Sequence, residues 1–227
     1  MTETIDRSEI LAVVGMTREA KILTGGPVLI GGGDATALSH KLEAILSHGC
    51  AGVISFGLCG ALDPALKVGD IVVGSAVADT QNAYETDQAW AERLCATVPG
   101  AVLGSFASAD GPVASVEGKA ALRLATGAAA VDLESYLVGR LARWFGIRFA
   151  VLRAVSDAAG RALPHAAQVG LGADGRPAIG KVFASLGSNP WQIPALIRTA
   201  LEAEDGFHAL ERARNLLGPG LGGAPDR

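Results

Sequence analysis

The chain has 227 residues, which is long enough for one well-filled α/β domain and short for two. A formal charge of -4 and a pI near 5.6 argue against a nucleic-acid partner, because binding a polyanion needs a basic face. No apolar run reaches the roughly twenty residues of a membrane span, and the acidic first residues are unlike a signal peptide. We therefore expect a cytoplasmic protein.

Cysteine, histidine and serine patterns give no metal site and no serine nucleophile. Cys50, Cys59 and Cys95 are an odd number at wide spacing, which suits neither a disulfide framework nor a CxxC site. The four histidines form no zinc pattern with them. Ser55, in GVISFG, lies outside the G-x-S-x-G pattern of serine esterases. We expect no metal and no esterase activity.

The first third of the chain predicts two strands, each followed by a helix. Residues 10–14 are apolar and end at Gly15, after which a short helix carries Glu19. Glu19 would be either a solvated helix acid or a site acid at the carboxyl end of the strand. Residues 27–30 predict the second strand, followed by three glycines and a helix at 35–47. These glycines could form a backbone nest for an anion, although they match neither GxGxxG nor a P-loop.

The middle of the chain predicts three strands and one helix, separated by loops. Residues 51–56 predict a strand, followed by a loop from Gly57 to Gly60 in which the backbone can approach a ligand. A Val-Gly-Asp turn leads into a strand at 71–77, and residues 78–100 predict a loop followed by a helix. Residues 102–107 predict a further strand, which runs into the loop at 108–113.

Residues 131–157 carry the pattern around which the rest is organised. Apolar residues recur every three or four positions from Leu133 to Phe145, including Trp144, so one face of a helix here should be apolar and the helix should end at Gly146. Short apolar stretches at 128–131 and 148–155 predict a strand on each side. A right-handed helical crossover between them would make these two strands parallel.

Parallel strands would bring acidic residues from both strand ends to one edge of the sheet, where open α/β sheets bind ligands. Asp132 and Glu134 follow the first strand, whereas Ser156 and Asp157 follow the second. Two acids facing one pocket suit general acid and base chemistry or the binding of sugar hydroxyls. Each acid also has a local explanation, Glu134 in the first turn of a helix and Asp157 as a helix N-cap.

The C-terminal part predicts helices and a tail. An Asp-Gly turn at 174–175, a helix near 178–186 and a long amphipathic helix or helix pair at 192–217 follow Asp157. The Gly/Pro-rich residues 218–227 are expected to be a flexible tail. The domain would then span residues 1–217, with residues 170–217 as its distinctive C-terminal helices.

Three motifs together resemble the nucleoside phosphorylase and nucleosidase superfamily: GMTRE, the block GLCGALDPALKVGDIVV, and VDLES paired with RAVSD. The resemblance covers residues 10–157 and implies a single-domain α/β protein, a three-layer αβα sandwich with a twisted mixed central sheet. The segments LPHAA, DGRP and PWQIPAL resemble the hopanoid-associated branch of that superfamily, which is linked to release of adenine from adenosylhopane.

The resemblance implies a role for each matching residue. Asp157 would protonate the purine near N7 with the help of Ser156, and Glu19 would orient the attacking water. Glu134 would hold the ribose hydroxyls. The other implied substrate contacts are Met16 on the 5′ side, Asp132 and Leu133 around the sugar, and Gly57, Gly60, Asp110 and Val113.

The chain departs from the family at Pro112, which stands where related nucleosidases have a purine-stacking Phe. Stacking on a base contributes about 1 to 3 kcal/mol in nucleobase sites. Recognition of the base would consequently depend more on Asp157 and on backbone groups.

The nucleophile and the substrate stay open at this point. Arg18, Gly32 and Gly33 are candidate contacts for phosphate, the one co-substrate expected in place of a cofactor, whereas retention of Glu19 favours water. The main hypothesis is cleavage of adenosylhopane, and the alternatives are a methylthioadenosine or S-adenosylhomocysteine type nucleosidase and a non-catalytic nucleoside-binding protein.

The expected partners are a lipid-linked nucleoside, further copies of the chain in a homo-oligomer, and transiently a membrane surface. The apolar residues of the last helix would either wall an apolar cavity mouth or pack against the sheet or another subunit; they are Leu196, Ile197, Leu201, Phe207, Leu210, Leu216 and Leu217.

Overall fold

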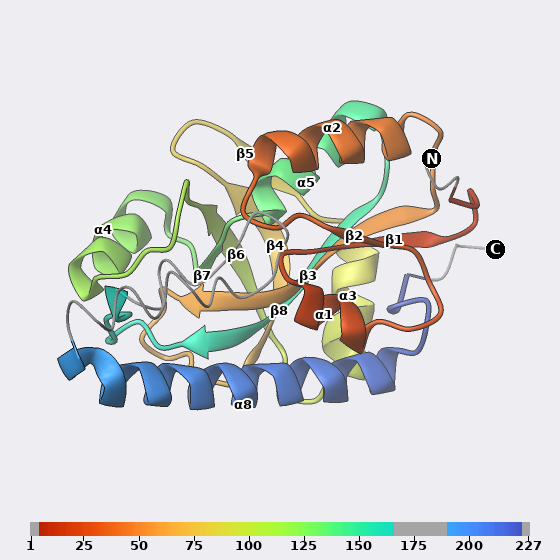
Figure 1. The fold of residues 1–227 in the computed structure, drawn as a ribbon. Coiled ribbons are helices and arrows are strands. Elements are labelled where there is room, and N and C mark those ends of the chain that lie inside the picture. The colour runs from red at the N-terminus through yellow and green to blue at the C-terminus, as the bar shows by residue number, and fades with distance from the viewer. Residues whose placement is uncertain (1–4, 166–189, 224–227) are drawn as a thin grey trace.

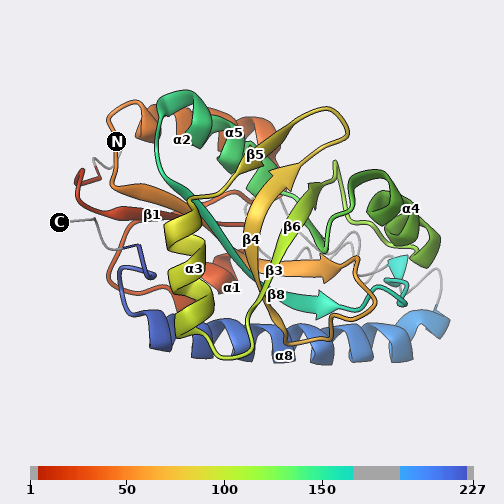
Figure 2. The ribbon, with the colours of Figure 1, turned by 180° about the vertical axis from the view of Figure 1, so that it is seen from behind.

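A mixed sheet of eight strands lies between two layers of helices (Figure 1). This computed structural model describes residues 5–165 and 190–223 of the chain. Helices α2 and α5 cover one face of the sheet, and α1, α3 and α8 lie on the other (Figures 1 and 2). The predicted fold class is confirmed. Within the described ranges, no helix is both long and apolar enough to cross a membrane.

The strands, in chain order, are β1 (Ile10–Val14), β2 (Val28–Ile30), β3 (Gly52–Ala61), β4 (Ile71–Ala78), β5 (Ala83–Glu85), β6 (Val102–Ser108), β7 (Ala130–Asp132) and β8 (Phe149–Asp157). The helices are α1 (Thr17–Ile22), α2 (Ala35–Leu46), α3 (Gln88–Thr97), α4 (Val116–Thr126), α5 (Ser135–Phe145) and α8 (Ile193–Leu217), with a 3-10 turn η1 (Pro190–Gln192) before the last. The sequence pattern indicated neither β5 nor α4.

The strands run in two directions, and this corrects one prediction. Strands β1, β2, β3 and β8 are parallel, whereas β7 pairs antiparallel with β3, so the predicted parallel unit of β7 and β8 is wrong. Because β8 pairs with both β3 and β4, the strands β3, β8, β4, β6 and β7 form a closed ring of pairings. Gly60 of β3 has Val131 on one side and Asp157 on the other, so β7 still brings its end to the edge where β8 ends.

Strand β3 is longer than the sequence predicts. The segment from Gly57 to Gly60, predicted as a loop, continues the strand and stays paired with β8, with an irregularity in register between Cys59 and Gly60. Paired strands on both sides supply backbone hydrogen bonds that outweigh the weak β propensity of glycine.

Alternate residues of the central strands pack on opposite faces, as expected for strands buried on both sides. In β8, Val151 packs with α2 and α5, whereas Leu152 packs with α3 and α8. In β1, Val13 packs on the face covered by α2 and α5, and Val14 packs on the opposite face. The sheet is therefore held by two separate apolar layers.

Helix α5 ends where the sequence predicts, at Gly146, whose φ of 66° is the left-handed cap conformation. Its inward face differs from the predicted one. Val138, Gly139 and Ala142 are buried, whereas Trp144 is 82% exposed. The interval pattern located the helix correctly but included one residue that lies on the outer face.

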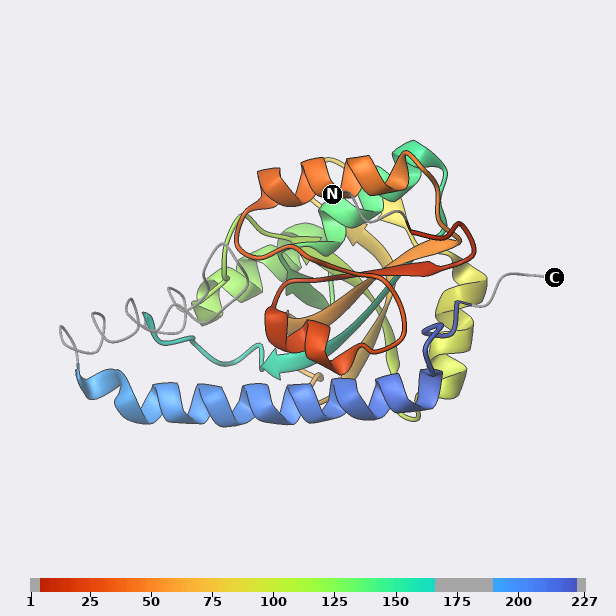
Figure 3. The ribbon, with the colours of Figure 1, turned by 45° about the vertical axis from the view of Figure 1, so that its right-hand side comes forward.

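Helix α8 is a single helix of 25 residues that runs the length of the molecule (Figure 3). The first residues after it are packed, because Leu221 is buried and its carbonyl accepts a 2.9 Å hydrogen bond from Trp90 Nε1. The predicted turn at 174–175, the helix at 178–186 and the last four residues of the tail lie outside the described residues.

Candidate active site

A cavity of about 270 Å³ opens where β1, β3, β7 and β8 end. It collects residues from four separate predicted motifs, so that the acids Asp132, Glu134, Asp157 and Glu19 surround one space. The predicted site residues that line it are Met16, Glu19, Gly60, Val113, Asp132, Leu133, Glu134, Ser156 and Asp157.

Glu19 is a buried acid rather than a solvated one, with an exposed fraction of 1%. It is the third residue of α1, and its Oε2 accepts hydrogen bonds of 2.8 Å from the backbone N–H groups of Gly15 and Met16. Its Oε1 accepts one of 2.7 Å from Leu58 N. Burial raises the pKa of Glu19, although Arg153 and these three donors act against the shift.

Arg153 holds the acidic groups of the site together, and it was not among the predicted residues. Its side chain is 2% exposed, its Nη2 donates to Glu134 Oε2 at 3.0 Å and to Ser55 Oγ at 2.6 Å, and its Nη1 donates to Leu58 O at 3.0 Å. Its Nε lies 2.6 Å from Asp132 Oδ2 without hydrogen-bond geometry, so that contact is ionic. Burial alone would lower the pKa of Arg153, but the carboxylates of Asp132, Glu134 and Glu19 raise it.

Asp132 is fully engaged by the protein. Its Oδ1 accepts a 3.0 Å hydrogen bond from Ser135 N at the start of α5, and its Oδ2 contacts the Ser135 hydroxyl as well as Arg153. Asp132 therefore fixes the start of α5 and the orientation of Arg153.

Glu134 is the acid with a free oxygen. Its Oε2 is held by Arg153, whereas its Oε1 accepts no hydrogen bond from the described residues. Burial raises the pKa of Glu134 to about 7, with Arg153 lowering it and Asp132 and Glu19 raising it further. Because Glu134 lines the cavity, this oxygen can accept a hydrogen bond from a bound molecule.

Asp157, at the end of β8, is held by two side chains. Its Oδ1 pairs with the ammonium of Lys119 from α4, and its Oδ2 lies 3.0 Å from Ser156 Oγ. Ser156 Oγ is also within 3.1 Å of the carbonyl of Cys59. Lys119, like Arg153, was not predicted.

Five of the predicted contacts do not line this cavity. Gly57 lies behind Glu19, so that a Cβ added there would be 2.3 Å from Glu19 Oε1. Gly32, Gly33 and Asp110 line a neighbouring cavity of about 470 Å³, which shares Leu133 and Glu134 with the first.

Arg18 is the fifth. Its guanidinium forms an ion pair with Glu204 of α8 and lies 3.9 Å from the centre of the Phe207 ring. The structure therefore joins Arg18 to α8 instead of to the acidic cluster.

Apolar side chains form the rest of the wall around Asp157. Leu58, Pro112 and Leu163 line the cavity together with Thr199 and Ala203 of α8. Leu163 N donates to Ala114 O at 2.8 Å, which joins the segment after β8 to the loop before α4.

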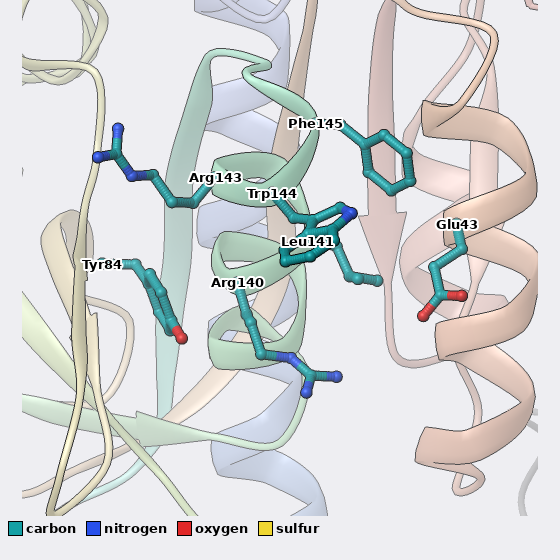
Figure 4. Close-up of a pocket in the computed structure, with 7 residues that line it drawn as sticks. All are labelled: Glu43, Tyr84, Arg140, Leu141, Arg143, Trp144 and Phe145. Carbon is teal, nitrogen blue, oxygen red and sulfur yellow. The ribbon is translucent and has the colours of Figure 1, made fainter.

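A larger cavity of about 680 Å³ lies elsewhere, between α2, α5 and β5 (Figure 4). Tyr84, Arg140, Arg143 and Trp144 line it, with Glu43 as its one carboxylate. It has no pair of acids and no strand end, so it is not the candidate. In the described part of the chain, no group of three His, Cys, Asp or Glu residues could hold a metal ion.

The two unpredicted cations differ in how far the sequence indicates them. Arg153 interrupts an otherwise apolar strand, and a charge in a buried strand needs a partner, so its sequence context was a usable signal. Lys119 lies in an ordinary helix 38 residues from Asp157, and nothing in that segment points to the contact.

A model of the Phosphorylase superfamily matches residues 8–183, more than half of the chain. The chain belongs to the phosphorylase superfamily. The match includes every predicted site residue from Met16 to Asp157. Family and acidic cavity together identify an enzyme of the nucleoside phosphorylase or nucleosidase kind.

Solved structures share the fold of this superfamily member at low identity. A 5′-methylthioadenosine/S-adenosylhomocysteine nucleosidase from Helicobacter pylori is 17% identical, with a TM-score of 0.62 over 91% of this chain and 97% of that one. Futalosine hydrolase from the same organism is 17% identical, with a TM-score of 0.61 over 91% and 97%. An S-adenosylhomocysteine nucleosidase from Streptococcus pyogenes is 19% identical, with a TM-score of 0.58 over 68% and 86%.

Proposed function

We propose that this chain cleaves the N-glycosidic bond of a purine nucleoside and that its substrate is adenosylhopane, an adenosine whose ribose carries a triterpenoid. The observation that carries the reaction type is the meeting of Glu19, Glu134 and Asp157 in one cavity of nucleoside size. Cleavage of this bond needs an acid for the departing base, stabilisation of a cationic sugar and a placed nucleophile. These three acids supply one group for each need.

In the proposed reaction, Asp157 gives a proton to N7 of the purine as the bond from C1′ to N9 breaks. Glu134 Oε1 accepts hydrogen bonds from the ribose hydroxyls. Positive charge that develops on the sugar is stabilised by the acidic cluster, in which Glu19, Asp132 and Glu134 share the single charge of Arg153. Glu19 orients the nucleophile and takes up its proton.

Water is the nucleophile in this proposal. Among the described residues that line the cavity, Arg153 is the only arginine or lysine, and its guanidinium is engaged by Asp132, Glu134, Ser55 and Leu58. Phosphate needs several cationic or amide donors. Arg18 is paired with Glu204, and Gly32 and Gly33 line the neighbouring cavity. A neutral nucleophile oriented by Glu19 fits the acidic surroundings better than an anion.

Cavity size bears on the identity of the substrate. A space of about 270 Å³ is near the lower limit for ligand pockets and holds a nucleoside but no triterpenoid. The 5′ substituent of adenosylhopane must then extend outside the cavity. The same size also suits a nucleoside with a small 5′ thioether, so a methylthioadenosine type nucleosidase is the second candidate.

The outer face of α8 favours the lipid-linked substrate. Ile193, Ile197 and Leu201 are 45%, 56% and 61% exposed and follow one another at four-residue intervals. They form one outward stripe, because successive residues of a helix are about 100° apart. Thr199 and Ala203, which line the cavity, lie about 200° further round the helix. We propose that this stripe rests on a membrane surface and so brings the cavity to the lipid.

Two assays test the substrate. Adenine release is measured from adenosylhopane in vesicles, from a short-chain soluble mimic and from methylthioadenosine, each with and without phosphate. The proposal requires turnover of the first two without phosphate. Turnover of methylthioadenosine alone would leave only the second candidate. Binding of these nucleosides without any turnover would instead identify a non-catalytic binding protein.

A double variant tests the membrane contact. Ile197→Asp with Leu201→Asp should lower turnover of the vesicle-bound substrate at least about 10-fold while leaving the soluble mimic unchanged, because the stripe lies opposite the cavity. Leu216→Asp, an equally exposed position near the other end of α8, is the matched control. Equal turnover by the double variant and the control would refute the membrane contact.

A further inference from the structure

Lys119 is a buried cation whose hydrogen-bonding capacity is completely used. Its side chain is 1% exposed, and its ammonium contacts Asp157 Oδ1, the carbonyl of Ala158 at 2.9 Å and the carbonyl of Arg161 at 3.1 Å. Three acceptors match the three N–H groups of a protonated lysine, whereas a neutral amine has only two. Lys119 is therefore held as a cation with Asp157 as its counter-charge.

This ion pair makes the two oxygens of Asp157 different. Oδ1 is held by Lys119 from outside the cavity, because Lys119 does not line the space that Asp157 lines. Oδ2 lies 3.0 Å from Ser156 Oγ, whose hydroxyl can donate to the Cys59 carbonyl instead, at 3.1 Å. A proton on Asp157 is consequently accommodated at Oδ2 only.

Stability alone is a poor reason for such a pair. Removing two charges from water often costs more free energy than their mutual attraction returns. Apolar residues of similar volume in place of such a pair frequently make a protein equally stable or more stable. A lysine that is buried against one acid of a reaction cavity is better explained by what it does for that acid.

We propose that Lys119 is a positioning residue for the proton transfer that Asp157 carries out. This inference rests on the proposed function. In the acid form of Asp157, the proton on Oδ2 moves to N7 of the purine, and the electron pair of the bond from C1′ to N9 moves to N9, which returns Asp157 to the carboxylate that pairs with Lys119. The negative charge left on Asp157 is compensated by Lys119, which keeps all three of its protons. After the base leaves, Glu19 releases to solvent the proton that it took from the attacking water, and solvent returns a proton to Oδ2, so the cycle gains and loses none.

Lys119→Met removes the charge and keeps an unbranched side chain. We expect kcat for adenine release to fall about 10- to 100-fold, with KM changed less than about 3-fold, because the base and ribose contacts remain. Arg123→Met is the matched control, since Arg123 lies one turn further along α4 and pairs with Asp63 away from the cavity. It should keep the wild-type kcat.

A double-variant cycle separates positioning from a purely structural role. If Lys119 acts only through Asp157, then Asp157→Asn with Lys119→Met should be no slower than Asp157→Asn alone. Asp157→Asn should also lower the unfolding temperature, because it leaves the Lys119 charge without its counter-charge, and adding Lys119→Met should recover part of that loss.

An unchanged kcat in Lys119→Met, or a further loss of activity in the double variant, would overturn the inference. The inference would also be overturned if Lys119→Met raised KM by as large a factor as it lowered kcat. Failure of the wild-type enzyme to release any purine would instead refute the proposed function, and the unfolding temperatures would still report on the ion pair.

Discussion

Glu19, Asp132 and Glu134 share one buried guanidinium, and this imbalance of charge sets the properties of the site. Burial keeps the pKa values of Glu19 and Glu134 above their ordinary range, and repulsion from Asp132 and Glu19 adds to the shift of Glu134, because Arg153 cannot neutralise three carboxylates at once. The backbone donors of Gly15, Met16 and Leu58 hold Glu19 in one position in spite of this. Perturbed acids held in fixed positions are what acid and base chemistry requires.

Gly57 tests the placement of Glu19. In Gly57→Ala, the added Cβ would lie 2.3 Å from Glu19 Oε1, so the carboxylate must move. A shift of about 1 Å in a catalytic group can cost about 100-fold in rate, and we expect kcat/KM to fall by that order. Gly160→Ala, which has nothing within 4 Å of its added Cβ, is the control and should keep full activity. A fully active Gly57→Ala enzyme would show that Glu19 is not needed in its present position.

At the scale of elements, the sequence located most strands and helices because apolar stretches end at glycines, as in strand β1 before Gly15 and helix α5 before Gly146. It failed at β3 because Gly57 and Gly60 have low β propensity, and only pairing with β8 keeps them in the strand. The predicted direction of β7 was wrong because a strand of three residues does not indicate which strand it will pair with.

Gly139 tests how closely α5 packs on the sheet. An added Cβ would lie 2.7 Å from Val77 Cγ2 and 2.9 Å from Phe149 Cε1, both on stiff side chains. Overpacking should lower the free energy of unfolding of Gly139→Ala by about 1 to 3 kcal/mol. The gain of about 1 kcal/mol that alanine brings to a helix interior is too small to offset a clash of this kind.

Denaturant unfolding measures this change. Arg140→Ala, on the exposed side of α5, is the control and should stay within about 0.5 kcal/mol of the wild type. A Gly139→Ala variant as stable as the control would show that α5 can move away from β4 and β8 without cost.

For the whole molecule, the acidic cluster links stability to pH. The pKa of Glu134 is about 7 in the folded chain against an ordinary value of 4.5. Between these values the folded protein keeps a proton that the unfolded chain has lost, so this contribution to stability is complete below 4.5 and is lost as the pH rises through about 7. The raised pKa of Glu19 acts in the same direction.

The unfolding temperature should therefore fall between about pH 5 and about pH 8. Glu134→Gln keeps an oxygen for Arg153 but removes the titration, so its curve should be shallower over the same range. Thermal unfolding of the two proteins side by side measures this. Parallel curves would mean that Glu134 titrates alike in the folded and unfolded chains.

The sequence predicted the acids of the site because they follow strand ends, where a sheet brings distant residues together. It could not place Lys119, because α4 was not recognised and the contact with Asp157 spans 38 residues. The same limit applies to Arg18, whose pairing with Glu204 depends on how α8 packs across the finished domain.

The most direct test of the proposed reaction is adenine release by wild-type enzyme and by Asp157→Asn, at a temperature where both are folded. Asn keeps the shape of the side chain but has no acidic proton to give. We predict a loss of about 10²- to 10⁴-fold in kcat, the usual contribution of a general acid, with nucleoside binding retained. Release of adenine by Asp157→Asn at near the wild-type rate would contradict the assignment of Asp157 as the acid and the mechanism built on it.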